Sequence, residues 1–343
     1  MEITVQLNDL DRQIWEEELA EFVPSRIFDA HTHLYDFRPE ISAAVEPVAT
    51  YGTLWLDYPL STWSMLGQVD QLLLPGRQVH RIAFGNPLQK SSLEQANAFT
   101  AQQVLADPQS IALMLTRPSL SPREMIDQIR KYHFQGLKPY RTHAVTGDSV
   151  ECRITDFLPE EQIEIADQLH LMVMLHLSKR KAIADPDNLN DLERLATKYP
   201  HVQWVLAHCA RSYYDRPLIQ AANRLRAIPN LWYEISSVCD ADAMAELLSI
   251  GGPDRVMYGS DDIPVGILRG KYITFGHGWA GMTDTNHQFD LSHCDPRMTF
   301  TRYESLRAFR RATSRHGYGK TELEKLFFTN AMNLISSRQS GLG

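Results

Sequence analysis

The sequence predicts an α/β fold, a (β/α)8 or TIM barrel, from its length, its composition and one recurring pattern. The chain has 343 residues, within the range of about 200 to 400 that such barrels occupy. Hydrophobic residues make up 43% and charged residues 22% of it, so it can bury a large core and is neither disordered nor fibrous. From residue 26 onward, short apolar runs alternate with amphipathic segments, which is typical of βα units.

Eight apolar runs are the predicted strands. The run from Leu171 to Leu175 is apolar throughout rather than alternating, as expected of a strand that is covered on both faces. The eight segments are 26–33, 79–85, 110–116, 136–140, 171–176, 202–208, 230–235 and 255–260. Eight parallel strands joined by crossover helices close into a barrel. We therefore expect one domain over residues 1–343, with the barrel at about 26–335.

Amphipathic segments between these runs are the predicted helices: 91–106, 121–133, 159–169, 189–199, 217–227 and 241–250. A further helical pattern begins at Asn8 and ends before Pro24, which predicts an extra N-terminal helix outside the barrel. Two connections are much longer than usual, 34 to about 61 after the first strand and 262 to about 297 after the last. Because both follow the C-terminal end of a strand, we expect these long loops to wall or cover a pocket.

Charge and cysteine content argue against several classes of protein. The chain has 34 Lys and Arg against 42 Asp and Glu, a net charge of -8, so it has no electrostatic footprint for nucleic acid or an anionic membrane. Its four cysteines form no CxxC pair, and we expect reduced thiols in a cytoplasmic protein. The N-terminus lacks a basic region, and there is no run of about 18 apolar residues, so neither secretion nor membrane insertion is expected.

Four of the thirteen histidines lie at or just past the C-terminal ends of predicted strands. His31 and His33 end the first strand, His176 the fifth and His208 the sixth, and Asp261 follows the eighth. The C-terminal ends of the strands form the active face of such a barrel. We therefore expect these five side chains to meet at one rim.

The His31-Thr32-His33 spacing lets one cation bind both rings, because side chains two apart on a strand point the same way, about 6 to 7 Å apart. Asp29 precedes them in the same row, where it either steadies a histidine ligand or is a buried carboxylate satisfied by backbone. The alternative to a metal site, four satisfied core histidines, requires four coincidences of position. Three other histidines lie at the N-terminal ends of their strands: His80, His170 and His201. We expect these three to serve stability.

Five short motifs follow one another on the predicted strands: Asp29-Ala30-His31-Thr32-His33, Gly136-Leu137-Lys138-Pro139, His176, Ala207-His208-Cys209-Ala210 and Gly259-Ser260-Asp261. Together they resemble the amidohydrolase superfamily, in particular its amidohydrolase-2 (amidohydrolase-related) branch. The stretch from Phe328 to Leu334 also resembles the Asn-Ala segment that ends many members. The resemblance covers nearly the whole chain, from about Arg26 to Leu334.

The resemblance implies a (β/α)8 barrel that holds one or two divalent metal ions. It makes three histidines metal ligands: His31, His33 and His176. It makes Asp261 a ligand or a proton shuttle, and His208 either a second-metal ligand or a catalytic group that faces the substrate. Lys138 matches the carboxylated lysine of binuclear members, but mononuclear members also have a lysine here, and we favour one metal.

The residue types support the same chemistry. Imidazole nitrogens with one carboxylate suit Zn²⁺ first, with Mn²⁺, Fe²⁺ or Co²⁺ as alternatives. A bound ion lowers the pKa of a water molecule to about 7 and polarises a carbonyl group. We expect Asp261 to take the proton from that water and pass it to the leaving group, while His208 steadies the oxyanion.

Cationic and polar side chains follow the fourth and sixth strands, and four are the expected substrate-binding residues: Lys138, Tyr140, Arg141 and Arg211. Cations at the active rim of a chain with net charge -8 indicate an anionic substrate, most simply a carboxylate held by a guanidinium group. Arg211, three residues after His208, is preferred for this contact. For Lys138, pairing with a substrate carboxylate and a buried ion pair both remain open.

Three functions fit these patterns. The first is a metal-dependent hydrolase in which metal-activated water cleaves a C–O or C–N bond of a small carboxylate-bearing lactone, amide or ester. The second is a metal-dependent non-oxidative decarboxylase of an aromatic or unsaturated acid, which the same branch contains. Some of those decarboxylases have a Glu where this chain has His31, which favours hydrolysis. The third is a barrel that only binds or assembles, and the complete set of five side chains argues against it. A homodimer is the default assembly.

Overall fold

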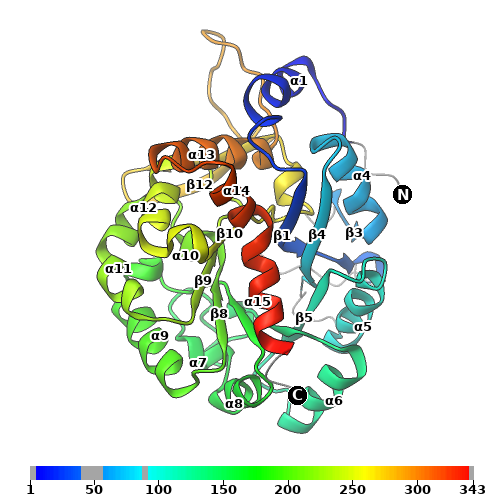
Figure 1. Ribbon diagram of the computed structural model, residues 1–343, viewed down its shortest axis with the longest axis vertical. Coiled ribbons are helices and arrows are strands. Elements are labelled where there is room, and N and C mark those ends of the chain that lie inside the picture. Colours follow the sequence, from blue (N-terminus) through cyan, green and yellow to red (C-terminus); the bar gives the residue numbers. More distant parts are fainter. Residues whose placement is uncertain (1–4, 40–56, 87–91, 340–343) are drawn as a thin grey trace.

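The computed structural model describes residues 5–39, 57–86 and 92–339. Eight parallel strands form one sheet in the order β1, β4, β5, β6, β7, β8, β9, β10 (Figure 1). Their bounds are Arg26–His33, Gln78–Phe84, Ile111–Thr116, Gly136–Pro139, Met172–Leu175, Gln203–Leu206, Leu231–Glu234 and Val256–Met257. Backbone hydrogen bonds from Ala30 N to Tyr258 O and from Asp261 N to His31 O, both 2.9 Å, join the two sheet edges. The predicted (β/α)8 barrel is confirmed.

Helices surround the barrel, and the predicted ones are present (Figure 1): α5 Leu93–Val104, α6 Pro122–Tyr132, α8 Glu160–Gln168, α9 Pro186–Lys198, α11 Arg216–Ala227 and α12 Ala241–Gly251. The chain continues after β10 with α13 Thr301–Arg315, α14 Lys320–Glu324, a π-helical turn Lys325–Thr329 and α15 Asn330–Gln339. The remaining short elements are α7 Ile154–Phe157, α10 Ala207–Arg211 and the 3-10 turns Arg141–His143, Ala182–Ala184, Gly252–Asp254 and Val265–Ile267.

A further helix, α4 (Trp63–Leu73), lies between β1 and β4 and was not among the predicted segments. Thr62 caps it by accepting a hydrogen bond from Met65 N at 3.2 Å. Its buried residues Met65, Leu66 and Val69 follow helical spacing and pack into the core. The helix supplies the first crossover that the barrel topology requires.

The extra N-terminal helix is present outside the barrel, as α1 (Asp9–Ile14) with a π-helical continuation to Leu19 (Figure 1). Asn8 caps it reciprocally: its side chain accepts from Asp11 N at 2.9 Å, and the Asp11 carboxylate accepts from Asn8 N at 2.8 Å. Just after the helix, the ring of Phe22 packs edge-on against Phe327 at 5.5 Å between centroids. The N-terminal segment is therefore anchored to the C-terminal helices.

The two long connections follow β1 and β10, as predicted. In the first, residues 40–56 lie outside the described part of the chain, and the described ends pair as β2 (Tyr35–Asp36) and β3 (Leu60–Ser61). The second is not irregular throughout, since it contains an antiparallel hairpin of β11 (Gly270–Phe275) and β12 (Gly278–Thr283). Gly276 allows the tight turn between them with a φ of 59°.

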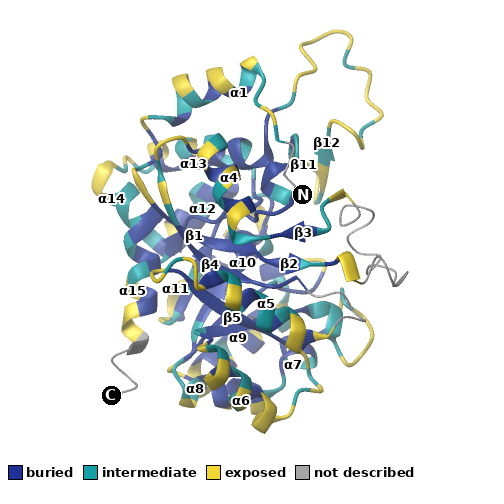
Figure 2. Ribbon diagram, turned by 90° about the vertical axis from the view of Figure 1, so that its right-hand side faces the viewer, coloured by how far each residue is buried: buried dark blue, intermediate teal, exposed yellow. Residues whose placement is uncertain are grey.

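Burial is continuous along the barrel strands, and exposure is confined mostly to the outer helices and loops (Figure 2). Every residue of β1 after Arg26 is buried. One apolar cluster fills the barrel interior. Within it, Phe28 packs against Phe328 toward the N-terminal end, and Phe84 packs against His31 and His33 at the C-terminal mouth. A larger cluster lies between the strands and the surrounding helices. Among the described residues, no helix is both long and apolar enough to cross a membrane.

Candidate metal centre and pocket

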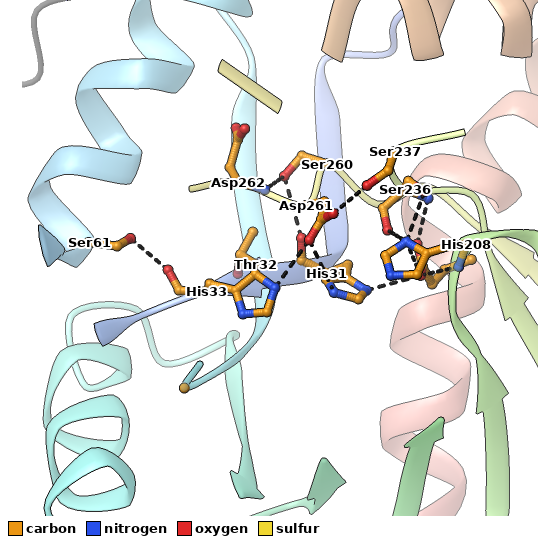
Figure 3. Close-up of polar contacts among 12 residues, drawn as sticks. His31, Thr32, His33, Ser61, His208, Ser236, Ser237, Ser260, Asp261 and Asp262 are labelled. Atoms are coloured by element: carbon orange, nitrogen blue, oxygen red, sulfur yellow. Dashed lines mark hydrogen bonds and ion pairs between the residues drawn. The ribbon is translucent and has the colours of Figure 1, made fainter. Parts of the chain in front are cut away.

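Side chains from four separated segments converge at the C-terminal mouth of the barrel, and those from β1, after β8 and after β10 are drawn in Figure 3. Asp261 Oδ1 lies 3.1 Å from His33 Nε2 and 3.4 Å from His31 Nε2. The His31 ring lies 4.8 Å from the ring of His208, measured between centroids. His176 follows, with its ring 5.0 Å from that of His208. The five predicted side chains therefore form a continuous cluster.

One group within this cluster has the compactness of a metal site. One ligand atom from each of His31, His33 and Asp261 lies within 4.8 Å of the others, and all three residues are buried. His176 belongs to no such compact group among the described residues. Burial holds the pKa of both His31 and His176 well below the usual value, so these imidazoles are neutral and their lone pairs are available.

Three of the histidines share one hydrogen-bonding pattern. His31 Nδ1 lies 3.0 Å from a carboxylate oxygen of Glu234. His176 Nδ1 lies 3.2 Å from the Leu177 carbonyl oxygen, and His208 Nδ1 lies 3.0 Å from the Ser236 carbonyl oxygen. These acceptors require a proton on Nδ1, which leaves the lone pair on Nε2. Each ring is thus prepared to bind a cation through Nε2.

Glu234, the last residue of β9, is a site residue that the sequence analysis missed. It is completely buried, and its Oε1 accepts hydrogen bonds from both His31 Nδ1 and His208 N, at 3.0 and 2.8 Å. Its Oε2 accepts from Ser236 N at 2.6 Å. A Cβ at Gly259 would lie 2.6 Å from this oxygen, so only glycine leaves room for the carboxylate.

The group His31, His208 and Glu234 is also compact enough to hold an ion. Both Glu234 oxygens already accept hydrogen bonds from N–H groups, however, and one of these bonds fixes the proton on His31. We therefore assign Glu234 to orienting the histidines rather than to binding metal. A glutamate that ends an apolar run, as in Leu231-Trp232-Tyr233-Glu234, was the available signal.

The backbone at His208 has an unusual conformation that places two predicted site residues. Four consecutive residues, His208 to Arg211, have φ between 51° and 57°, a left-handed turn that costs roughly 1–2 kcal/mol per residue. The turn places the His208 ring in the cavity wall, while the Arg211 guanidinium reaches the Lys179 carbonyl oxygen. The hydrogen bond from His208 N to Glu234 and a 2.6 Å bond from Arg211 Nη1 to the Lys179 carbonyl hold the turn at both ends.

Asp29 does not contact a histidine ring. Its Oδ1 accepts hydrogen bonds from His31 N at 3.1 Å and Ser260 N at 2.9 Å, so it joins the backbone of the first strand to that after the eighth. Arg302 lies behind it, at 3.6 Å, and also contacts Asp262 at 2.9 Å. Of the two interpretations of Asp29, the backbone-satisfied carboxylate is the one that the structure supports.

A cavity of about 330 Å³ opens in front of the cluster. It is lined by the five predicted metal and catalytic residues, by Lys138, Tyr140 and Arg141, and by Asn86, Tyr213, Pro264, Val265, Tyr272 and Trp279. Tyr272 and Trp279 come from the β11–β12 hairpin, and the Trp279 ring stacks on Tyr213 at 4.0 Å between centroids. The second long connection thus walls the pocket, as predicted.

Among the described residues, the cations at the pocket form no ion pair with a carboxylate. Lys138 is 1% exposed, its Nζ has no hydrogen-bond partner among the described residues, and burial lowers its pKa to about 8. Burial, with repulsion from Arg141, lowers the pKa of Arg211 to about 10. Arg211 lies behind the lining, with its guanidinium 5.9 Å from the Trp279 ring. No carboxylate of the described residues forms an ion pair with Lys138, Arg141 or Arg211.

Comparisons with known proteins agree with this architecture. The family model described as amidohydrolase, of the amidohydrolase-2 type, matches residues 28–335. A crystal structure of an amidohydrolase from Burkholderia multivorans with bound zinc is similar with a TM-score of 0.60 and 14% identity, covering 90% of this chain and 99% of that one. A search of curated protein sequences gives no significant match.

Two further structures cover almost the same length. One is a putative 2-pyrone-4,6-dicarboxylic acid hydrolase from Pseudomonas putida, with a TM-score of 0.56 and 13% identity, covering 92% of this chain and 98% of that one. The other is a 5-carboxyvanillate decarboxylase from Sphingomonas paucimobilis, with a TM-score of 0.53 and 13% identity, covering 91% and 99%. At such identities the similar structures establish the fold alone. The family model, however, covers most of the sequence. The chain therefore belongs to the amidohydrolase family and is an enzyme of the amidohydrolase type.

Proposed function

We propose that this enzyme is a metal-dependent hydrolase that cleaves a C–O or C–N bond of a small, carboxylate-bearing lactone, amide or ester. The observation that carries the proposal is the convergence of His31, His33 and Asp261, each offering one ligand atom within 4.8 Å of the others. That group opens directly onto the cavity, so a bound substrate would lie beside it.

The donor set fits a divalent cation. Two imidazoles and a carboxylate are common zinc ligands, and the Nδ1 partner of His31 directs the Nε2 lone pair toward Asp261. We propose zinc as the ion, with Mn²⁺, Fe²⁺ or Co²⁺ as alternatives, and the similar Burkholderia amidohydrolase contains zinc. His176 completes the proposed ligand set through its free Nε2.

A divalent cation held by these residues would supply a Lewis acid and would lower the pKa of a water molecule toward 7. The role proposed for Asp261 is to accept the proton of the attacking water and to transfer it to the leaving group. Burial opposes the charged form of Asp261, but the neighbouring histidines, including the hydrogen bond with His33, hold its pKa well below the usual range, so the carboxylate is ionised and available to a cation.

His208 has a narrower role than the sequence analysis expected. Its Nδ1 faces the Ser236 carbonyl oxygen at 3.0 Å, so the neutral ring carries a lone pair, not a proton, on Nε2. A neutral His208 therefore accepts a proton or binds a cation. We propose that it steadies the oxyanion only after it has become an imidazolium.

The substrate is proposed to be a small anion. Lys138 and Arg141 line the cavity without a carboxylate partner among the described residues, and Tyr140 lines it beside them. Arg211 remains in the proposal as a positioning group near the mouth, since its buried Nε has no partner in the described part of the chain. A carboxylate would neutralise this excess of positive charge and satisfy the orphaned donors.

A non-oxidative decarboxylase of an aromatic or unsaturated acid is the alternative, since a similar structure is a decarboxylase. In that reaction Asp261 or His208 would protonate carbon. Zinc-loaded enzyme should be assayed against lactones with a pH indicator and against aromatic acids for carbon dioxide release. Acid release from a lactone supports the hydrolase, and carbon dioxide release without hydrolysis overturns it.

The four unpaired cysteines agree with the proposed cytoplasmic location.

A further inference from the structure

Three residues at the end of β9 and just beyond it, Glu234, Ser236 and Ser237, contact site groups from other strands. Glu234 accepts from His31 Nδ1, and Ser236 faces His208 Nδ1 through both its carbonyl oxygen and its Oγ, at 3.0 and 2.9 Å. Ser237 donates a hydrogen bond from its hydroxyl to Asp261 Oδ2 (Figure 3). This segment therefore contacts a histidine from β1, the histidine after β8 and the carboxylate after β10.

The Ser237 contact divides the two oxygens of Asp261 between different tasks. Oδ1 points to the Nε2 atoms of His33 and His31, at 3.1 and 3.4 Å. Oδ2 points away from them and is held by Ser237, which is 1% exposed. A carboxylate fixed in this way offers a cation one oxygen in a set direction, whereas a free carboxylate can rotate and offer both.

The backbone conformation of Ser237 indicates that its hydroxyl group is held in place for a specific contact. Ser237 has a φ of 62°, in the left-handed region where glycine is unstrained and serine is not. The side chain is therefore held at a conformational cost. In exchange, the chain gains a buried hydroxyl group that reaches the metal-binding carboxylate. Strain of this kind is found at sites where a side chain must be held in place.

We propose that Ser237 is a positioning residue that restricts Asp261 to single-oxygen metal binding and thereby sets the coordination of the bound cation. This inference rests on the proposed metal-dependent function and adds a residue to it. Ser237 does not line the cavity, and its hydroxyl is used by Asp261 Oδ2, so it is proposed to act through Asp261 rather than on the cation itself. Its effect is on affinity and coordination geometry, as for other partners of metal ligands.

The test uses the full-length chain with zinc and cobalt as the probes. Ser237→Ala removes the hydroxyl and keeps the strained Cβ, whereas Ser237→Gly removes both. Ser305→Ala is the matched control, since Ser305 is 3% exposed and its hydroxyl has no partner in the described part of the chain. Zinc affinity is measured by competition with a chelator, and the visible absorption spectrum of the cobalt-loaded protein reports the coordination. Thermal unfolding of metal-free protein reports the backbone effect separately.

Both Ser237 variants are expected to bind zinc about 10- to 100-fold more weakly than the wild type and to share an altered cobalt spectrum, while Ser305→Ala matches the wild type. Wild-type zinc affinity and an unchanged cobalt spectrum in both variants would overturn the inference. An effect confined to one variant would overturn it too, because the hydroxyl is absent from both. A wild-type protein that binds no zinc refutes the proposed function itself, which distinguishes the two failures.

Discussion

The two ends of the barrel use the same side chain for different purposes. At the C-terminal end, four histidines and Asp261 line one cavity. At the N-terminal end, His80 is also buried, but its Nδ1 is paired with Asp107 at 2.7 Å and its ring lies among Phe28 and Phe328. His170 and His201 stack on each other at 4.5 Å between centroids. A buried histidine alone therefore does not indicate a catalytic or metal site. Several histidines that converge on one cavity beside donors without hydrogen-bond partners do indicate such a site.

The largest expected effect is the loss of bound metal from the C-terminal end alone. His33→Ala should reduce the zinc content of dialysed protein from about one ion per chain to nearly none, because it removes a proposed ligand. His80→Ala should leave the zinc content unchanged and lower the free energy of unfolding by about 1–3 kcal/mol, since it removes a buried ring and its hydrogen bond with Asp107. Metal analysis and thermal unfolding compare the two variants. Equal zinc loss in both would contradict the assignment of the metal site to the C-terminal end of the barrel.

Asp261→Asn should lower kcat by about 10²- to 10⁴-fold, the range expected for loss of a general acid–base group. Asparagine keeps the shape of the side chain but cannot accept the proton. Activity on a lactone found in the substrate panel is the measurement, with circular dichroism to verify folding. A fully active variant would remove Asp261 from the mechanism.

The carboxylates that accept hydrogen bonds from histidines should also differ between the two ends of the barrel in their effect on zinc affinity. Glu234→Gln should weaken zinc binding about 10- to 100-fold, because an amide cannot accept from His31, His208 and Ser236 together. Asp107→Asn, its counterpart at the N-terminal end, should change stability without changing zinc affinity. Chelator competition on both variants makes the comparison, and wild-type zinc affinity in Glu234→Gln would show that His31 needs no such support.

Substrate binding should weaken as pH rises through about 8, the lowered pKa of Lys138. Below that value the ammonium is charged and attracts a carboxylate; above it, the charged fraction falls about tenfold per pH unit. KM for an anionic substrate should therefore rise about tenfold between pH 8 and 9.5 in the wild type. Lys138→Met should have a high KM with no such rise. A persistent rise in this variant would assign the effect to another group.

The smallest effect concerns backbone strain. Ala210→Gly should stabilise the protein by up to about 1 kcal/mol, because residue 210 has a φ of 56° that glycine adopts without strain. Ala221→Gly, an equally buried position in right-handed helix α11, should destabilise it by about 1 kcal/mol. Urea unfolding of the two variants gives the signs, and destabilisation of both would show that the turn at His208 is not strained.

Much of this arrangement follows from sequence patterns with a simple period. The apolar runs predicted the eight strands, and the two-residue spacing of His31 and His33 predicted that both point to the same place. The His31 and His33 rings lie 5.2 Å apart between centroids, in agreement with this spacing. For the four histidines and Asp261, the position at the end of a predicted strand was sufficient to predict that they lie at one rim of the barrel.

Other features depend on contacts that a linear pattern does not contain. Glu234 ends a strand like the histidines, but its importance comes from donors on β1 and after β8. The left-handed turn from His208 to Arg211 contains no glycine, so no local signal marked it. The β11–β12 hairpin has short, partly exposed strands with a weak alternation. Each is determined by tertiary packing rather than by local preference.

The central claim is that one cation binds between His31, His33 and Asp261. A crystal structure of zinc-loaded protein, with anomalous diffraction recorded at the zinc edge, tests it most directly. We predict one strong peak within about 2.0–2.2 Å of His31 Nε2, His33 Nε2 and Asp261 Oδ1. A barrel mouth without a peak, or zinc found instead at the stacked pair His170 and His201 at the opposite end, would contradict the account.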